Sequence, residues 1–150
     1  MTTIRAQGST RIDAPAAIVY EILADYLERH PRLLPPAFSN VIVESGGVGA
    51  GTIIRFNVKI GGITRTVRAK VTEPEPGRVL AETDFERGAV TSFTVEPHGE
   101  RACEVTIATE WTASGLRALL ERWMAPPKLE ALYAEELANL RKAAESRVRT

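Results

Sequence analysis

Apolar and polar residues follow two different periods along this chain. Through most of the chain, apolar positions alternate with polar ones, which is the period of a half-buried β-strand. Glycine- or proline-rich turns separate most of these runs, and the Gly61-Gly62 pair is a hairpin signal. The pattern predicts seven strands, at Thr2–Ile12, Phe38–Glu44, Thr52–Ile60, Ile63–Thr72, Arg78–Phe85, Ala89–Glu96 and Ala102–Trp111.

The segment from Gly115 to Arg149 has helical spacing instead, with an apolar stripe that starts at Leu116 and continues to Ala144. Two shorter helical segments are expected after the first strand. One begins behind Asp13 as the N-cap and runs to Ala24, and a second, broken by prolines, lies within residues 25–36. One long helix needs one large apolar surface to cover it. A curved antiparallel sheet that grips this helix would supply that surface and leave room inside for an apolar guest.

Pro126 and Pro127 lie inside the predicted long helix, where each lacks a backbone donor and clashes with the preceding turn, at a cost of about 3 kcal/mol or more. We therefore expect the helix to kink or restart there. Trp123, Met124 and Tyr133 flank this point, and their apolar surfaces would line the entrance to an interior pocket. The same three residues are also compatible with a structural role as core anchors.

Composition restricts the partners and the environment of the chain. Its 150 residues include 19 basic and 19 acidic ones, so no long-range field favours nucleic acid or an acidic membrane surface. Cys103 is the single cysteine, which excludes an internal disulfide and a cysteine-based zinc motif and suits a reducing cytoplasm. No apolar run approaches the roughly 20 residues needed to cross a bilayer, and residues 1–9 lack a signal-peptide pattern. We expect one domain over residues 1–150, cytoplasmic, without an integral membrane segment, and monomeric or homodimeric.

Known catalytic and cofactor motifs are missing from the sequence. The glycine-rich turn at residues 45–51 lacks the G-x-G-x-x-G spacing and precedes a strand, which argues against nucleotide binding. No G-x-S-x-G nucleophile elbow occurs either. His30 and His98 are the only histidines and lack metal-ligand spacing, so we expect no metal and no cofactor. Both histidines are expected at the surface, with His30 placed where it could edge a pocket.

Short sequence pieces spread over nearly the whole chain resemble one superfamily. They are Ile12-Asp13-Ala14-Pro15 followed by Val19 and Leu23-Ala24-Asp25-Tyr26, Gly49-Ala50-Gly51-Thr52, Val71-Thr72-Glu73, Phe93-Thr94-Val95-Glu96-Pro97 and Leu137-Ala138-Asn139-Leu140-Arg141. In this order they resemble the SRPBCC superfamily of START-related lipid-transfer domains, Bet v 1-like proteins and polyketide cyclase/dehydrases. The resemblance implies an α+β helix-grip fold of order β-α-α-β6-α, in which a seven-stranded curved antiparallel sheet wraps around a long C-terminal helix. Activities in this superfamily differ, so the fold alone does not determine the function.

Alternation along the strands predicts which side chains face the interior of that fold. Many of these side chains are small or β-branched, which leaves volume for a ligand, although a filled core is the simpler alternative. The predicted ligand-binding residues are Phe56, Val58, Val67, Ala69, Phe93, Thr109, Trp111, Leu120, Trp123, Met124 and Tyr133.

Arg65, Glu82 and His30 are the candidates for acid–base or anchoring chemistry. Arg65 shares a strand face with Val67, so its guanidinium should point inward, toward a carbonyl or carboxylate of a ligand.

The register of the strand Arg78–Phe85 decides where Glu82 lies. If Leu80 faces inward, Glu82 does too, and it can then pair with Arg65. We favour the opposite register, with Phe85 inward and the acidic side chains of the strand in solvent.

The apolar lining and the absence of a catalytic motif favour a binding module for a hydrophobic or aromatic small molecule, such as a lipid, a quinone or a polyketide-like compound. A cyclase or dehydratase that uses Arg65, Glu82 or His30 in acid–base catalysis is the first alternative. A quinone-chaperone or partner-binding role is the second, because the chain loosely resembles the coenzyme-Q-binding branch of the superfamily. The polarity of the interior distinguishes these functions, since the enzyme alternative requires an inward pair of titratable side chains.

Overall fold

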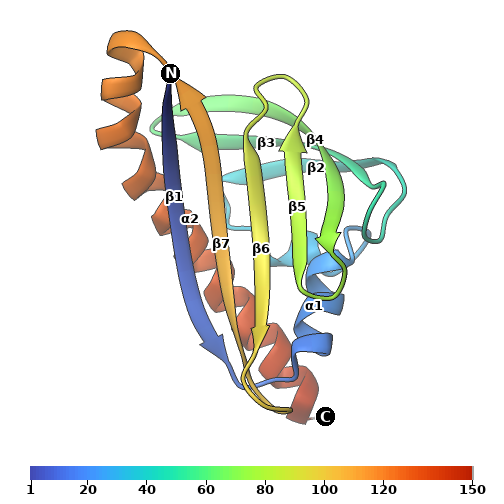
Figure 1. Ribbon diagram of the computed structural model, residues 1–150. Helices are drawn as coiled ribbons and strands as arrows, with labels where there is room; N and C mark the ends of the chain where they lie inside the picture. The colour runs from blue at the N-terminus through green and yellow to red at the C-terminus, as the bar shows by residue number, and fades with distance from the viewer. Residues whose placement is uncertain (150) are drawn as a thin grey trace.

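The computed structural model describes residues 1–149, and within this range one antiparallel sheet of seven strands bends around a long helix (Figure 1). The strand order is β1-β7-β6-β5-β4-β3-β2, so β1 joins the sheet beside the last strand. The elements in chain order are β1 (Thr2–Ile12), α1 (Ala16–Ala24), the 3-10 helix η1 (His30–Leu33), β2 (Phe38–Ser45), β3 (Ile53–Ile60), β4 (Ile63–Glu75), β5 (Val79–Asp84), β6 (Val90–Pro97), β7 (Cys103–Ala113) and α2 (Gly115–Arg149). The predicted helix-grip architecture is confirmed.

The second of the two early helices is shorter than expected. It consists of the single 3-10 helix η1, with Pro31 in its first turn. Leu34 has an extended backbone immediately before Pro35, as expected for a residue that precedes proline. The prolines therefore limit this segment to one short turn.

Helix α2 runs without interruption from Gly115 to Arg149, through Pro126 and Pro127. Of the two expected responses, a kink or a restart, the restart does not occur, and Figure 1 shows the helix axis bending between its orange first turns and its red last turns. Bending is a common response of a helix to internal prolines. No helix within residues 1–149, α2 included, has the combination of length and apolar character that crossing a membrane requires.

The fully buried core lies where α1 and the second half of α2 meet the sheet. Its largest completely enclosed side chains include Ile12, Leu23, Leu80, Leu137 and Leu140, from β1, α1, β5 and α2. Apart from Ala118, the buried residues of α2 all follow the two prolines. The second half of α2 thus closes the core, and its first half extends beyond it.

The glycine-rich loop between β2 and β3 is bound to the end of α1. Gly49 donates its N–H to the carbonyl of Ala24 over 2.9 Å, and the Tyr26 N–H donates to the carbonyl of Gly47 over 2.9 Å. A side chain at Gly47 would collide with Leu27, whose Cγ lies 2.6 Å from the position of a Cβ atom. The loop thereby fixes the backbone that carries Tyr26.

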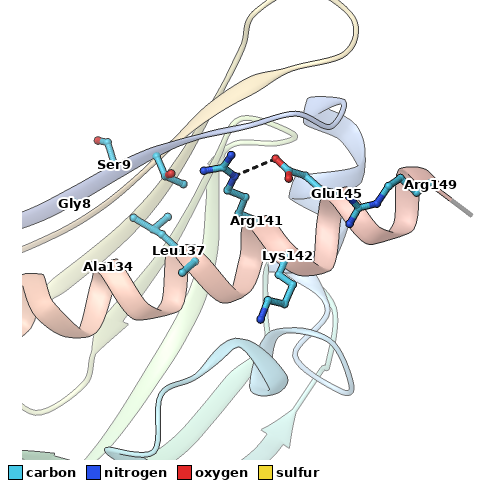
Figure 2. Close-up of a pocket in the computed structure, with 10 residues that line it drawn as sticks. Gly8, Ser9, Ala134, Leu137, Arg141, Lys142, Glu145 and Arg149 are labelled. Carbon is cyan, nitrogen blue, oxygen red and sulfur yellow. Dashed lines mark hydrogen bonds and ion pairs between the residues drawn. The ribbon is translucent and has the colours of Figure 1, made fainter.

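Gly8 lies where α2 packs on β1, as Figure 2 shows for Gly8 and Leu137. A Cβ atom on Gly8 would lie 3.4 Å from Tyr133 Cβ and 3.6 Å from Leu137 Cδ1. These are ordinary van der Waals distances, so the contact has room for a methyl group but for nothing larger.

We therefore predict that Gly8→Val lowers the free energy of unfolding by about 1–3 kcal/mol, because a branched side chain would overpack the contact between β1 and α2. Gly8→Ala is the matched control and should change the stability much less. Urea denaturation of the three proteins measures both effects. Equal loss in the two variants would contradict this view of the contact.

Candidate functional site

A cavity of about 520 Å³ lies between the sheet and α2. Most of its wall is apolar and comes from the inward faces of β3, β4, β6 and β7. The structure places eight of the predicted ligand-binding residues on this wall: Phe56, Val58, Val67, Ala69, Phe93, Thr109, Trp111 and Tyr133.

The other three predicted ligand-binding residues, Leu120, Trp123 and Met124, do not line the cavity, and Trp123 and Met124 therefore do not edge its entrance as expected. All three are more than half exposed. Glu121 and Ala125, from the same turns of α2, line the cavity in their place. The helical period correctly identified an apolar stripe, but this stripe faces away from the cavity.

Four polar side chains of this mainly apolar cavity lie close together: Tyr26, His30, Glu82 and Glu136, which we call the acid–base cluster. They come from the connection after α1, from η1, from β5 and from α2. The Tyr26 hydroxyl donates to Glu82 Oε2 over 2.6 Å. His30 Nε2 lies 3.5 Å from Glu136 Oε2 and 4.0 Å from Glu82 Oε2. The cluster thus combines two carboxylates, an imidazole and a phenol.

His30 is only 3% exposed, so the expected surface position is wrong. Its Nδ1 lies 2.6 Å from the carbonyl oxygen of Leu23. Because a carbonyl can only accept, Nδ1 carries a proton and Nε2 is directed toward the carboxylates. The ring also stacks on Tyr26, with 4.5 Å between centroids, and contacts Phe93 edge to face. These contacts hold the imidazole in one orientation.

Strand β5 adopts the register that we did not favour. Leu80 is fully buried, whereas Phe85 lies beyond the end of the strand, half exposed, with the Arg68 guanidinium 4.8 Å from its ring centroid. This cation–π contact provides Phe85 with a partner outside the core. Glu82, two residues after Leu80, therefore faces the cavity, and Asp84 also lines it.

The surroundings of the cluster raise the pKa values of both Glu82 and His30. Burial raises the pKa of the Glu82 carboxyl, although the charge of His30 and the bond from Tyr26 act against this rise. Burial alone would lower the pKa of His30, but the nearby carboxylates of Glu136 and Glu82 outweigh it and raise that pKa. Both groups retain a proton to higher pH than in water, and for Glu82 this is a shift toward the range useful for acid–base catalysis.

Sequence reasoning missed Glu136, which is buried and has an Oε2 atom without a hydrogen-bond partner among the described residues. A signal was present, because Glu136 follows Tyr133 by three residues and precedes Leu140 by four, which is the spacing of one helix face. A buried carboxylate oxygen of this kind normally requires a donor. A proton or a hydroxyl group of a ligand would satisfy it.

A chain of hydroxyl groups extends the polar part of the wall. Thr91 Oγ1 and Thr109 Oγ1 lie 2.7 Å apart, and Thr109 Oγ1 also bonds to the Tyr133 hydroxyl. Burial raises the pKa of Tyr133 to about 12, so this phenol stays protonated. The chain can donate or accept hydrogen bonds without changing its charge.

Arg65 faces the cavity as predicted, but not as a partner of Glu82. The Glu82 carboxylate instead accepts the hydrogen bond from Tyr26 and pairs with His30. Burial, and next the positive charge of Arg87, lower the pKa of Arg65. The Arg65 guanidinium remains a donor for a polar group on a ligand.

Glu121 fixes the first turns of α2 at the cavity. It accepts a bond from Trp111 Nε1 over 3.0 Å through Oε2 and one from Arg117 Nε over 3.0 Å through Oε1. Glu121 therefore ties α2 to the end of β7 while both partners line the cavity.

A second hollow, of about 480 Å³, lies between β1 and the last turns of α2 (Figure 2). Its charged groups include Arg141 and Glu145, whose Nε and Oε2 atoms lie 3.2 Å apart as a pair on the same helix. The hollow does not contain any member of the acid–base cluster, so the cavity inside the sheet is the candidate site.

The raised pKa values of Glu82 and His30 predict that stability decreases with rising pH. Between the unfolded and folded pKa values the folded state binds more protons than the unfolded chain, so the stabilisation is complete at low pH and is lost on the alkaline side. The loss begins above pH 4.5 for Glu82 and above pH 6.5 for His30, which are the ordinary pKa values of these groups. Urea denaturation across this range should give a steeper decrease for the wild type than for Glu82→Gln. His98→Gln, at the exposed hairpin, should retain the wild-type slope, and equal slopes in all three proteins would contradict the assignment.

Comparison with known proteins identifies relatives of the same architecture. A solution structure of the KanY protein is 31% identical, covers 97% of this chain and 99% of its own, and superimposes with a TM-score of 0.83. The Zhui aromatase/cyclase of Streptomyces sp. R1128 is 20% identical, with coverages of 99% and 98% and a TM-score of 0.80. Norcoclaurine synthase of Thalictrum flavum, solved with dopamine and hydroxybenzaldehyde, is 19% identical, with coverages of 97% and 88% and a TM-score of 0.74.

The two enzymes, at 20% and 19% identity, establish similarity of fold. No protein of curated function matches the sequence significantly. The family described as polyketide cyclase/dehydrase and lipid transport matches residues 3–145. The resemblance to the SRPBCC superfamily is thereby confirmed, and the chain belongs to the polyketide cyclase/dehydrase and lipid transport family.

Proposed function

We propose that this protein is a cyclase- or dehydratase-like enzyme that acts on a carbonyl compound of aromatic or polyketide-like character bound in the cavity. The observation that carries the proposal is the acid–base cluster, in which Glu82 and His30 face an apolar cavity with raised pKa values. A carrier needs one or two polar groups to orient its ligand. Two carboxylates and an oriented imidazole exceed that need and supply what proton transfer requires.

Glu82 is the proposed base. The bond from Tyr26 and the contact with His30 both involve Oε2, so Oε1 is the oxygen left to meet a bound molecule. This oxygen would remove a proton from the carbon next to a carbonyl group. The electron pair of the broken C–H bond then forms the enolate, whose charge needs a nearby donor.

His30 is the proposed acid. Its Nδ1–H is occupied by the Leu23 carbonyl, so the proton available for transfer is the one on Nε2. In a dehydration, this proton would go to the departing hydroxyl group, the enolate electron pair would form the new C=C bond, and water would leave with the former C–O electron pair. In a cyclisation, the same proton would neutralise the oxygen of the carbonyl that the enolate carbon attacks. Glu136 would support the protonated imidazole from 3.5 Å.

The remaining polar groups would orient the substrate. Arg65 can bind a carbonyl or carboxylate oxygen, and the hydroxyl chain ending at Tyr133 can bind another oxygen. The names of the two enzymes that share this fold, an aromatase/cyclase and a synthase solved with an aldehyde, are consistent with carbonyl chemistry in such a cavity.

Carriage of a hydrophobic molecule, including a quinone-chaperone role, is the second candidate. The apolar wall that Phe56, Val58, Val67 and Phe93 provide favours it. Burial against such a wall contributes roughly 25 cal/mol per Å² to affinity, without any requirement for turnover. The two candidates differ in what happens after binding, so one experiment can separate them.

The aldol adduct of benzaldehyde and acetone is a suitable probe, because its dehydration gives a conjugated ketone that is followed by absorbance. We predict that the wild type accelerates this dehydration and that Glu82→Gln slows it by about a hundredfold or more, since the amide cannot act as a base. Binding of the ketone product, measured through Trp111 fluorescence, should change little in this variant.

Glu86→Gln is the matched control, because Glu86 lies exposed in the turn after β5 and should not affect the rate. Equal rates for the wild type and Glu82→Gln would contradict the enzymatic proposal. Retained binding of the ketone in both proteins would then favour carriage.

A further inference from the structure

The first turns of α2 carry an apolar stripe that no described part of the protein covers. Its members are Leu116, Leu119, Leu120, Trp123 and Met124, which we call the outer stripe. Each is more than half exposed, and Trp123 is 74% exposed. Scattered exposed apolar residues are ordinary, but five at helical spacing form a continuous surface. Such a surface indicates a partner.

The orientation of these turns is fixed by contacts on the opposite side of the helix. Ala118 is buried there, and Glu121 and Ala125 line the cavity. At about 100° per residue, these positions lie across the helix axis from Leu116 and Trp123. The outer stripe therefore faces outward while the cavity wall is intact.

Basic residues flank the outer stripe, although the whole chain is neutral. Residues 115–128 include Arg117, Arg122 and Lys128 but one acidic residue, Glu121, which already pairs with Arg117. The region around the outer stripe thus has an excess of positive charge that the composition of the chain conceals.

The hairpin between β3 and β4 adds to this charge. Residues 53–72 contain five basic residues and no acidic one. Arg65 faces the cavity and Arg55 and Arg68 pair with Glu44 of β2, so the charge at the surface comes mainly from Lys59 and Lys70. The tip of the hairpin approaches α2, because Lys128 Nζ lies 2.6 Å from where a Cβ atom of Gly61 would be. Ile63, also at the tip, is 67% exposed. The hairpin and the helix together expose apolar side chains, Ile63 and the outer stripe, close to basic side chains.

We propose that the outer stripe docks the protein on the surface of an anionic lipid bilayer. The leucines and Trp123 would enter the boundary between headgroups and acyl chains, and Arg122 and Lys128 would contact lipid phosphates. The helix would lie in the plane of the membrane surface rather than cross it. A bilayer is favoured over a protein partner because the stripe lies on the outer face of a helix, among cations. An apolar layer beneath anionic headgroups matches both features and does not require a surface of complementary shape.

The outer stripe lies next to the cavity, so docking would bring the cavity close to the bilayer. Arg117 and Ala125, on the same turns of α2, line the cavity. An apolar substrate dissolved in the bilayer would then enter the cavity next to the docked helix. This consequence depends on the proposed function, whereas the docking itself does not.

The test uses the full chain with vesicles of phosphatidylcholine alone or mixed in equal amounts with phosphatidylglycerol. The protein should sediment with the mixed vesicles, less so as salt increases, and little with phosphatidylcholine alone. Trp123 emission should shift to shorter wavelength on binding. Trp123→Phe should still bind but lose that shift, since Trp111 is the only other tryptophan.

The double variant Leu119→Ser and Trp123→Ser should partition more than about tenfold less, because burial of a single large apolar side chain already changes an equilibrium constant by that factor. Val148→Ser is the matched control, since Val148 is an exposed apolar residue near the far end of the same helix. Circular dichroism verifies that all variants are folded.

Equal vesicle binding by the wild type and the double variant, or no binding to anionic vesicles, would overturn the proposal. A wild-type dimer that the double variant converts to a monomer, measured by light scattering without lipid, would overturn it in favour of an interface between two copies. Glu82→Gln should bind vesicles like the wild type, so failure of the docking surface and failure of the proposed catalysis are distinguishable.

Discussion

Ionisable side chains enclosed in an apolar cavity must compensate one another for the hydration that they lose. Each buried ion loses several kcal/mol of hydration, and only close, well-oriented partners offset that loss. In this protein the imidazole of His30 lies near the carboxylates of Glu82 and Glu136, Tyr26 donates to Glu82, and the Leu23 carbonyl holds the imidazole. These groups come from three distant parts of the chain. The acid–base cluster therefore exists only when η1, β5 and α2 are packed together.

The two halves of α2 have different tasks. The half after Pro127 carries Tyr133, Glu136, Leu137 and Leu140, which close the core and complete the cluster. The half before Pro126 contributes to the cavity wall on one side and leaves the outer stripe exposed on the other. Figure 1 shows a bend between the two halves. The half after the bend packs in the core, and the half before it borders the cavity and the solvent. This division explains how one helix can belong to both the core and the proposed docking surface.

Regular periods made the strands, the long helix and most of the cavity wall predictable. Alternation on β3, β4, β6 and β7 identifies inward residues because each of these strands has one clearly apolar face. Strand β5 lacks that contrast, since Leu80 and Glu82 share one face and Val79 and Ala81 share the other. Its register depends on contacts with other elements, which include the pairing with β4 and β6, the burial of Leu80 and the bond from Tyr26, and no local pattern reveals them.

Irregular segments and the far side of an amphipathic helix were not predictable in the same way. His30 lies in a short 3-10 turn between prolines, where no period indicates burial. Helical spacing found the outer stripe but not its direction, because a period reports that a face is apolar and not what covers it. The position of Glu136, in contrast, could have been predicted, because its spacing from Tyr133 and Leu140 places it on the buried face of the helix.

The most direct test of the buried acid–base cluster is the pKa of His30, measured by NMR titration of the two imidazoles and assigned with His98→Gln. The pairing of His30 with the two carboxylates predicts a value above the ordinary 6.5. It also predicts that Glu82→Gln lowers the value, because the carboxylate that stabilises the imidazolium is removed. A His30 pKa below 6.5, as burial without charged partners would produce, or a value unaffected by Glu82→Gln, would contradict the pairing of His30 with these carboxylates.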